Sequence, residues 1–168
     1  MLDLLELIPL TTVFNMGLLI AYVAVVTRVT SYTVVLAAAT LIEILHLSIS
    51  TYLHRFFGIE EYAYLVFHLW YLFFAGTDFL LVIAVILLCR KLDLRIQVSS
   101  KLVLGIFLFL GVLQVASYIE RLYLNTELLE PIYMHGIPII NGAITAILFA
   151  QLLYELLRKR NQYDEERF

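Results

Sequence analysis

The chain has 168 residues, of which 62% are hydrophobic and 15% are charged, and its net charge is −3. Soluble domains are about half apolar and about a quarter charged, so this composition indicates a membrane protein. It excludes nucleic-acid binding through a large basic patch. The single cysteine, Cys89, excludes an internal disulfide and a metal site built from several cysteines.

Five apolar segments follow one another along the chain, each of a length that suits a transmembrane helix. Arg28 ends the first, and Gly58 with Glu60 marks the loop after the second. The third is long for one crossing, so it is either tilted or begins with an interfacial turn. Pro131 is well placed to open the fifth. The predicted spans are residues 8–27, 33–53, 62–89, 102–123 and 132–157.

These segments predict an all-α, polytopic transmembrane bundle of five spans over residues 1–157, followed by a charged cytoplasmic tail at 158–168. With alternating spans, Arg55 and Arg121 fall on one side and the other nine basic residues on the opposite side. Because cytoplasmic loops are rich in Lys and Arg, we expect the N-terminus outside and the C-terminus in the cytoplasm. No glycosylation sequon is present, which favours a bacterial inner membrane.

Ionisable residues recur inside the predicted spans, where they usually face the bundle interior because contact with lipid is costly. Glu43 and His46 lie on the second span, and His68 and Asp78 on the third. At 1.5 Å per residue, His46 and His68 lie about 10 Å below the outer surface. Thr11, Asn15 and Tyr22 of the first span form a weaker polar set.

The sequence therefore predicts one polar cluster, open to the outside and narrowing inward. Its members are Glu43, His46, His68, Asp78, Glu120, Arg121, His135 and Asn141. For Glu120, Arg121 and His135, a structural role near the membrane surface is the stronger interpretation.

Four functions compete for such a cluster. The first is a channel or transporter component that moves protons, ions or a small solute. The second is an accessory or regulatory subunit that binds partner proteins. The third is a b-type haem subunit with His46 and His68 as axial ligands. The fourth is an intramembrane metal site using Glu43, His46, His68 and His135. No catalytic signature such as HExxH is present, which argues against an enzyme, and the sequence assigns no cofactor.

The fifth span carries two further patterns. Gly136 and Pro138 predict a kink, because proline removes a backbone donor. Gly142, Ala146 and Ala150 repeat every four residues, and small residues at this spacing allow helices to approach closely. The partner helix would belong to the same chain, to a second copy or to a larger membrane complex.

Overall fold

The computed structural model describes residues 10–26, 28–124, 126 and 128–165, and within these ranges it contains helices and no strand. The all-α class is confirmed. The elements are α1 (Leu10–Val25), α2 (Ser31–His54), α3 (Glu60–Lys91), α4 (Val98–Ile119), the π-helical turns η1 (Glu120–Leu124) and η2 (Ile132–Gly136), and α5 (Ile137–Glu165).

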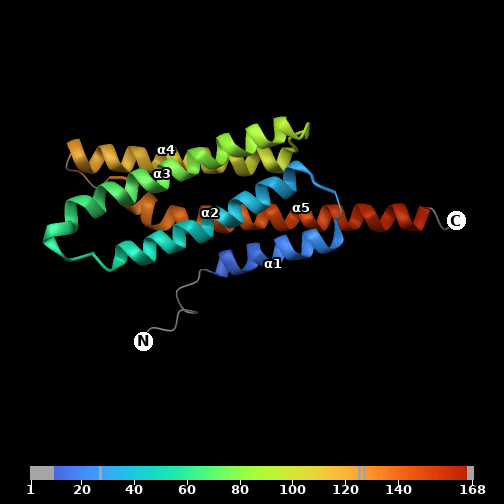
Figure 1. Ribbon diagram of the computed structural model, residues 1–168, viewed down its shortest axis with the longest axis horizontal. Coiled ribbons are helices and arrows are strands. Elements are labelled where there is room, and N and C mark those ends of the chain that lie inside the picture. The colour runs from blue at the N-terminus through green and yellow to red at the C-terminus, as the bar shows by residue number, and fades with distance from the viewer. Residues whose placement is uncertain (1–9, 27, 125, 127, 166–168) are drawn as a thin grey trace.

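The helices lie side by side along one long axis (Figure 1). α3 packs along α4, α2 along α3, and α1 against both α2 and α5. The α2–α3 and α4–α5 connections lie at one end of the bundle. The α1–α2 and α3–α4 connections lie at the other end, beyond which α5 extends toward the C-terminus.

Among the residues that the structure describes, four helices are long and apolar enough to cross a membrane: Ser31–His54, Glu60–Lys91, Val98–Leu124 and Ile132–Arg158. The surface of the bundle is apolar, as on α3, where Leu80, Ile83 and Leu87 are each more than half exposed. Polar side chains such as Asn15 and Gln114 are buried instead. An apolar exterior around buried polar groups suits a lipid environment, which supports the membrane class.

α1 is shorter than the first predicted span. It has 16 residues, so its length of about 24 Å is less than the hydrocarbon core of about 30 Å. Residues 8, 9 and 27 of that predicted span lie outside the described part of the chain. The fifth crossing and the orientation therefore stay predictions.

Several helices extend beyond the apolar segments that revealed them. α3 is one continuous helix of 32 residues, and the whole predicted third span, residues 62–89, lies within it. α4 begins at Val98, and the polar loop between α3 and α4 is therefore limited to residues 92–97. α5 continues to Glu165, so most of the predicted tail is helical. Hydropathy marks where a helix contacts lipid, whereas backbone hydrogen bonding continues into water.

Local sequence explains the first two connections. Thr30 precedes α2, where its hydroxyl accepts from the Thr33 backbone N–H while the Thr33 hydroxyl accepts from the Thr30 N–H. This reciprocal pair satisfies backbone donors that a helix start leaves free. Gly58, with φ at +85°, makes the turn before α3 in a left-handed conformation that favours glycine.

At the end near the α3–α4 connection, polar side chains join three helices. Ser31 accepts from the Gln97 backbone N–H at 3.0 Å and lies 3.3 Å from the Ser100 hydroxyl. Gln151 donates to the Gln97 side chain at 3.4 Å. Tyr32 donates its hydroxyl to the backbone carbonyl of Leu148 at 2.8 Å. We call Ser31, Tyr32, Gln97, Ser100 and Gln151 the hydrogen-bonded cluster.

Candidate functional site

A cavity of about 370 Å³ lies among the helices of the bundle. Every α-helix of the bundle contributes to its wall, together with η2. Its polar lining consists of Thr11, Thr12, Glu43, His46, Ser50, Asp78, Gln114, Tyr133 and Asn141. We call this space the polar cavity.

Glu43 of α2 is held by α1. The side-chain amide of Asn15 donates to Glu43 Oε1 at 2.8 Å, and Asn15 is fully buried. Glu43 Oε2 is also buried, yet no described residue hydrogen-bonds to it. The sequence placed Asn15 only in the weaker polar set, because an asparagine near a helix start has many ordinary uses. One carboxylate oxygen is thus fixed, and the other is left with accepting capacity.

His46 links α2 to α3. Its Nε2 lies 2.7 Å from Thr77 Oγ1 and 4.0 Å from Asp78 Oδ1. Thr77 Oγ1 also lies 2.8 and 3.0 Å from the backbone carbonyls of Phe73 and Phe74. The tautomer of His46 decides the direction of its bond to Thr77: a protonated Nε2 donates to the hydroxyl oxygen, and an unprotonated Nε2 accepts the hydroxyl proton. The ring packs edge-on against Phe74, with centroids 4.6 Å apart.

Asp78 is the most buried ionisable group of the polar cavity. It is 2% exposed, and its Oδ1 receives no hydrogen bond from the residues that the structure describes. An unsatisfied buried polar atom costs about 1–3 kcal/mol, and more when the group is charged. Asp78 therefore places an unsatisfied acceptor in the wall of the polar cavity.

A directed hydrogen-bond chain crosses the cavity wall. Trp70 Nε1 donates to the Tyr133 hydroxyl at 2.8 Å, and Tyr133 donates onward to Gln114 Oε1 at 2.8 Å. The chain joins α3, η2 and α4. Sequence reasoning singled out neither Tyr133 nor Trp70, since neither residue type distinguishes an inward from an outward position.

The π-helical geometry of η2 places Tyr133 in this chain, and η2 lies immediately before Pro138. Proline at 138 supplies no N–H to the carbonyl of Met134, four residues earlier. π-helical turns and kinks commonly accompany such a break. The predicted irregularity at Gly136 and Pro138 is therefore confirmed as an irregular helix start, and Pro138 itself lines the polar cavity.

Four of the eight predicted cluster residues line the polar cavity: Glu43, His46, Asp78 and Asn141. The other four, which are His68, Glu120, Arg121 and His135, do not.

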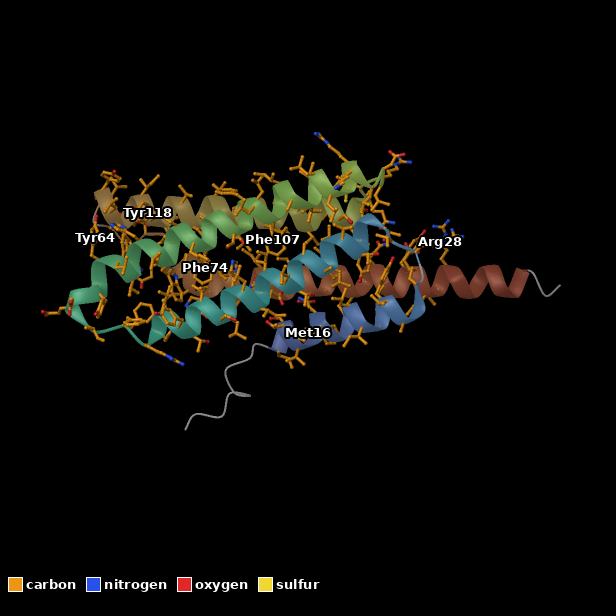
Figure 2. The ribbon with its side chains drawn as sticks, in the orientation of Figure 1. Met16, Arg28, Tyr64, Phe74, Phe107 and Tyr118 are labelled. Carbon is orange, nitrogen blue, oxygen red and sulfur yellow. The ribbon has the colours of Figure 1, made fainter. Side chains whose placement is uncertain are left out.

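His68 packs instead among aromatic rings at the α3–α4 contact. Its ring centroid lies 4.0 Å from that of Tyr64 and 5.5 Å from that of Tyr118. Figure 2 shows Tyr64 and Tyr118 close together near the end of the bundle, away from Phe107 at its middle. His46 lines the polar cavity and His68 does not, so this cavity does not bring the two imidazoles together as axial ligands of a haem.

Glu120 and Arg121 have separate structural partners. The Glu120 carboxylate accepts hydrogen bonds from the backbone N–H groups of Leu128 and Leu129, at 2.6 and 3.0 Å, and from Thr126 at 2.9 Å. It thereby holds the turn after α4. Arg121 forms an ion pair with Glu130 at 3.3 Å.

His135 is exposed on η2. With His68 and His135 outside the polar cavity, the expected metal ligands are dispersed. Within the described ranges, no group of three or more His, Cys, Asp or Glu side chains is arranged to hold a metal ion.

The polar cavity is lined by acidic residues and by no strongly basic one. Glu43 and Asp78 contribute carboxyl groups, and the described lining includes neither lysine nor arginine. Carboxyl groups in a low-dielectric surrounding attract cations more strongly than they would in water. The cavity is therefore suited to a cation or a hydrogen-bond donor.

No protein-family model, curated protein sequence or solved structure matches this chain. Function must therefore be inferred from the chemistry of the polar cavity.

Proposed function

We propose that this protein is a channel or transporter component that moves protons or a small cationic solute through the polar cavity. The observation that carries this proposal is the pair of carboxyl groups, Glu43 on α2 and Asp78 on α3, that line one cavity. Acidic residues inside a membrane commonly mark cation or proton pathways.

The unsatisfied oxygens support a functional role. Glu43 Oε2 and Asp78 Oδ1 are buried without a hydrogen-bond partner in the described part of the chain. An apolar side chain at either position would avoid this loss of free energy if the residues served only packing. A cation in the cavity would find a carboxyl group on α2 and another on α3, which gives the two acids a reason to be present.

The membrane placement forms part of the proposal. Five crossings with the N-terminus outside would put the α2–α3 and α4–α5 connections on the outer face of a bacterial inner membrane. The polar lining of α2 runs from Glu43 toward Ser50, in the direction of that outer end. A solute would thus enter the polar cavity from outside.

An accessory role is the second candidate, and one observation favours it. Ala146 and Ala150 on α5 are exposed, and a side chain added at Gly142 would meet nothing within 4 Å. This small-residue face is free to contact another helix, from a second copy or a larger complex. Such assembly is compatible with transport, since a partner could complete the pathway.

Purified protein in liposomes tests the transport proposal. An inside-negative potassium diffusion potential collapses as any cation enters, and a potential-sensitive dye follows the collapse. We expect the wild type to accelerate it over protein-free liposomes, and Glu43→Gln and Asp78→Asn each to remove most of that acceleration. These substitutions remove charge while keeping the shape of the side chain.

Glu61→Gln is the matched control, because Glu61 is exposed at the start of α3 and does not line the cavity. It should retain the wild-type rate. Two results would contradict the proposal: a wild type no faster than empty liposomes, or full activity in both cavity variants.

A further inference from the structure

The walls of the polar cavity carry aromatic rings close to its acidic groups. Trp70 and Phe74 of α3, Phe107 of α4 and Tyr133 of η2 all line it. The rings of Trp70 and Phe74 are adjacent, with centroids 5.0 Å apart. Phe74 and Phe107 are both buried, and Figure 2 labels them in the middle part of the bundle. The aromatic groups therefore belong to the same space as Glu43 and Asp78.

This combination exceeds what protons or small inorganic cations require. Proton pathways use water and titratable side chains, and inorganic cations favour rings of oxygen ligands. Aromatic faces instead attract organic ammonium groups, whose alkyl substituents contact the ring while the charge interacts with its quadrupole. Trp70 is the type of ring that binds such cations best.

The polar partners point to the same class. Asp78, 2% exposed, presents an oxygen that no described residue pairs, and it lies beside the Trp70–Phe74 wall on the same helix. His46 Nε2 is already hydrogen-bonded to Thr77 Oγ1, at 2.7 Å. The lining thus offers acceptors and aromatic side chains, with no lysine or arginine among its described residues that would attract an anion.

We infer that the solute is a small organic ammonium cation, with its charged nitrogen near Asp78 and Glu43 and its apolar part against Trp70 and Phe74. A cavity of about 370 Å³ lies within the range of small-molecule sites. The inference names the solute class of the proposed transport function and rests on that function for its role in the cell. Binding itself can be measured without transport.

The test is equilibrium binding to the full chain in detergent, using choline and its neutral carbon isostere 3,3-dimethylbutan-1-ol. Trp70 is the only tryptophan of the sequence, so its emission reports directly on the cavity wall. Radiolabelled choline in a scintillation proximity assay gives a second readout. We expect choline to bind saturably and to shift the Trp70 emission, and the isostere to bind at least about tenfold more weakly.

Variants then locate the binding site. Asp78→Asn and Glu43→Gln should each weaken choline binding about tenfold, since each removes one negative charge from a desolvated site. Phe74→Leu should weaken it several-fold while leaving the weak binding of the isostere unchanged. Glu61→Gln, outside the cavity, should bind choline as the wild type does.

The comparison of choline with its isostere uses wild-type protein, so it holds even if a variant fails to fold. Equal binding of the two probes, or no binding of choline, would overturn the inference. Choline binding without collapse of the liposome potential would keep the inference and reject the transport function. Cation flux without choline binding would do the reverse.

Discussion

The two polar regions of this bundle differ in how completely their hydrogen-bonding groups are satisfied. In the hydrogen-bonded cluster, Ser31, Gln97 and Gln151 each have partners on other segments. In the polar cavity, Glu43, Asp78 and the supporting Asn15 each retain a buried oxygen that no described residue pairs.

This difference separates two roles of buried polar side chains, one in stability and one in function. Interhelical hydrogen bonds that are complete stabilise a bundle by modest amounts and leave no room for a ligand. Incomplete ones reduce stability, and their retention in a membrane protein points to a partner supplied from outside. The hydrogen-bonded cluster therefore stabilises the bundle, whereas the polar cavity keeps polar groups whose hydrogen-bonding capacity is not used within the described chain.

The largest expected change in the free energy of unfolding concerns the hydrogen-bonded cluster. Tyr32 is 1% exposed, packs against Tyr22 with ring centroids 4.6 Å apart and hydrogen-bonds to Leu148. We expect Tyr32→Ala to lower the free energy of unfolding by about 3–5 kcal/mol, because it leaves a void and an unused carbonyl partner. Thermal unfolding in detergent measures this.

Tyr123→Ala is the matched control, since Tyr123 is 73% exposed. It should change the free energy of unfolding by less than about 0.5 kcal/mol. Equal losses in the free energy of unfolding of the two variants would mean that the contacts of Tyr32 do not stabilise the bundle.

Part of the fold and part of the polar cavity could be predicted from the sequence. The all-α class follows from composition and from the lengths of the apolar segments. Glu43, His46 and Asp78 could be placed inside the bundle because exposure of such groups to lipid is costly. The same reasoning could not tell which neighbour each would meet, since it fixes only that they avoid lipid.

His68 shows what residue spacing alone cannot predict. It shares a polar stripe with Asp78, ten residues later, but at about 100° per residue the two lie about 80° apart around α3. That angle turns Asp78 toward the polar cavity and His68 toward Tyr118 of α4. Position along the helix axis follows from residue spacing, whereas the rotation of α3 depended on packing that no periodic pattern records.

The aromatic wall escaped prediction for a different reason. Trp70 and Phe107 line the polar cavity, yet an aromatic residue in an apolar helix is equally at home against lipid. The extended ends of α3 and α5 were missed because charged residues in the last turns of a helix lie in water without ending it.

A substitution in the polar cavity should change the free energy of unfolding less than Tyr32→Ala does, and in the opposite direction. Asp78→Leu should raise the free energy of unfolding by about 1–3 kcal/mol, because it removes a buried oxygen without a partner and fills similar space. The same variant should lose choline binding and cation flux. Thermal unfolding and the binding assay, run on one preparation, measure both changes.

Gain of stability together with loss of binding is the signature of a residue kept for function. A destabilised Asp78→Leu protein would instead show that Asp78 fastens the bundle, and the distinction between the two regions would then fail at its central residue.

The smallest expected effect separates interhelical from local hydrogen bonds on α2. Ser31 contacts Gln97 and Ser100 across the bundle, whereas Ser48 is exposed and donates to the carbonyl of Ile44 in its own helix. Interhelical hydrogen bonds in membrane proteins contribute about 0.6 kcal/mol on average. Ser31→Ala should therefore lower the free energy of unfolding by about that amount or somewhat more, because two contacts are lost, and Ser48→Ala should leave it nearly unchanged.

Both variants remove one hydroxyl from the same helix, so a difference in thermal midpoint reports the interhelical contacts alone. Equal midpoints would show that packing around Tyr32, rather than the hydroxyl contacts of the hydrogen-bonded cluster, holds this end of the bundle together.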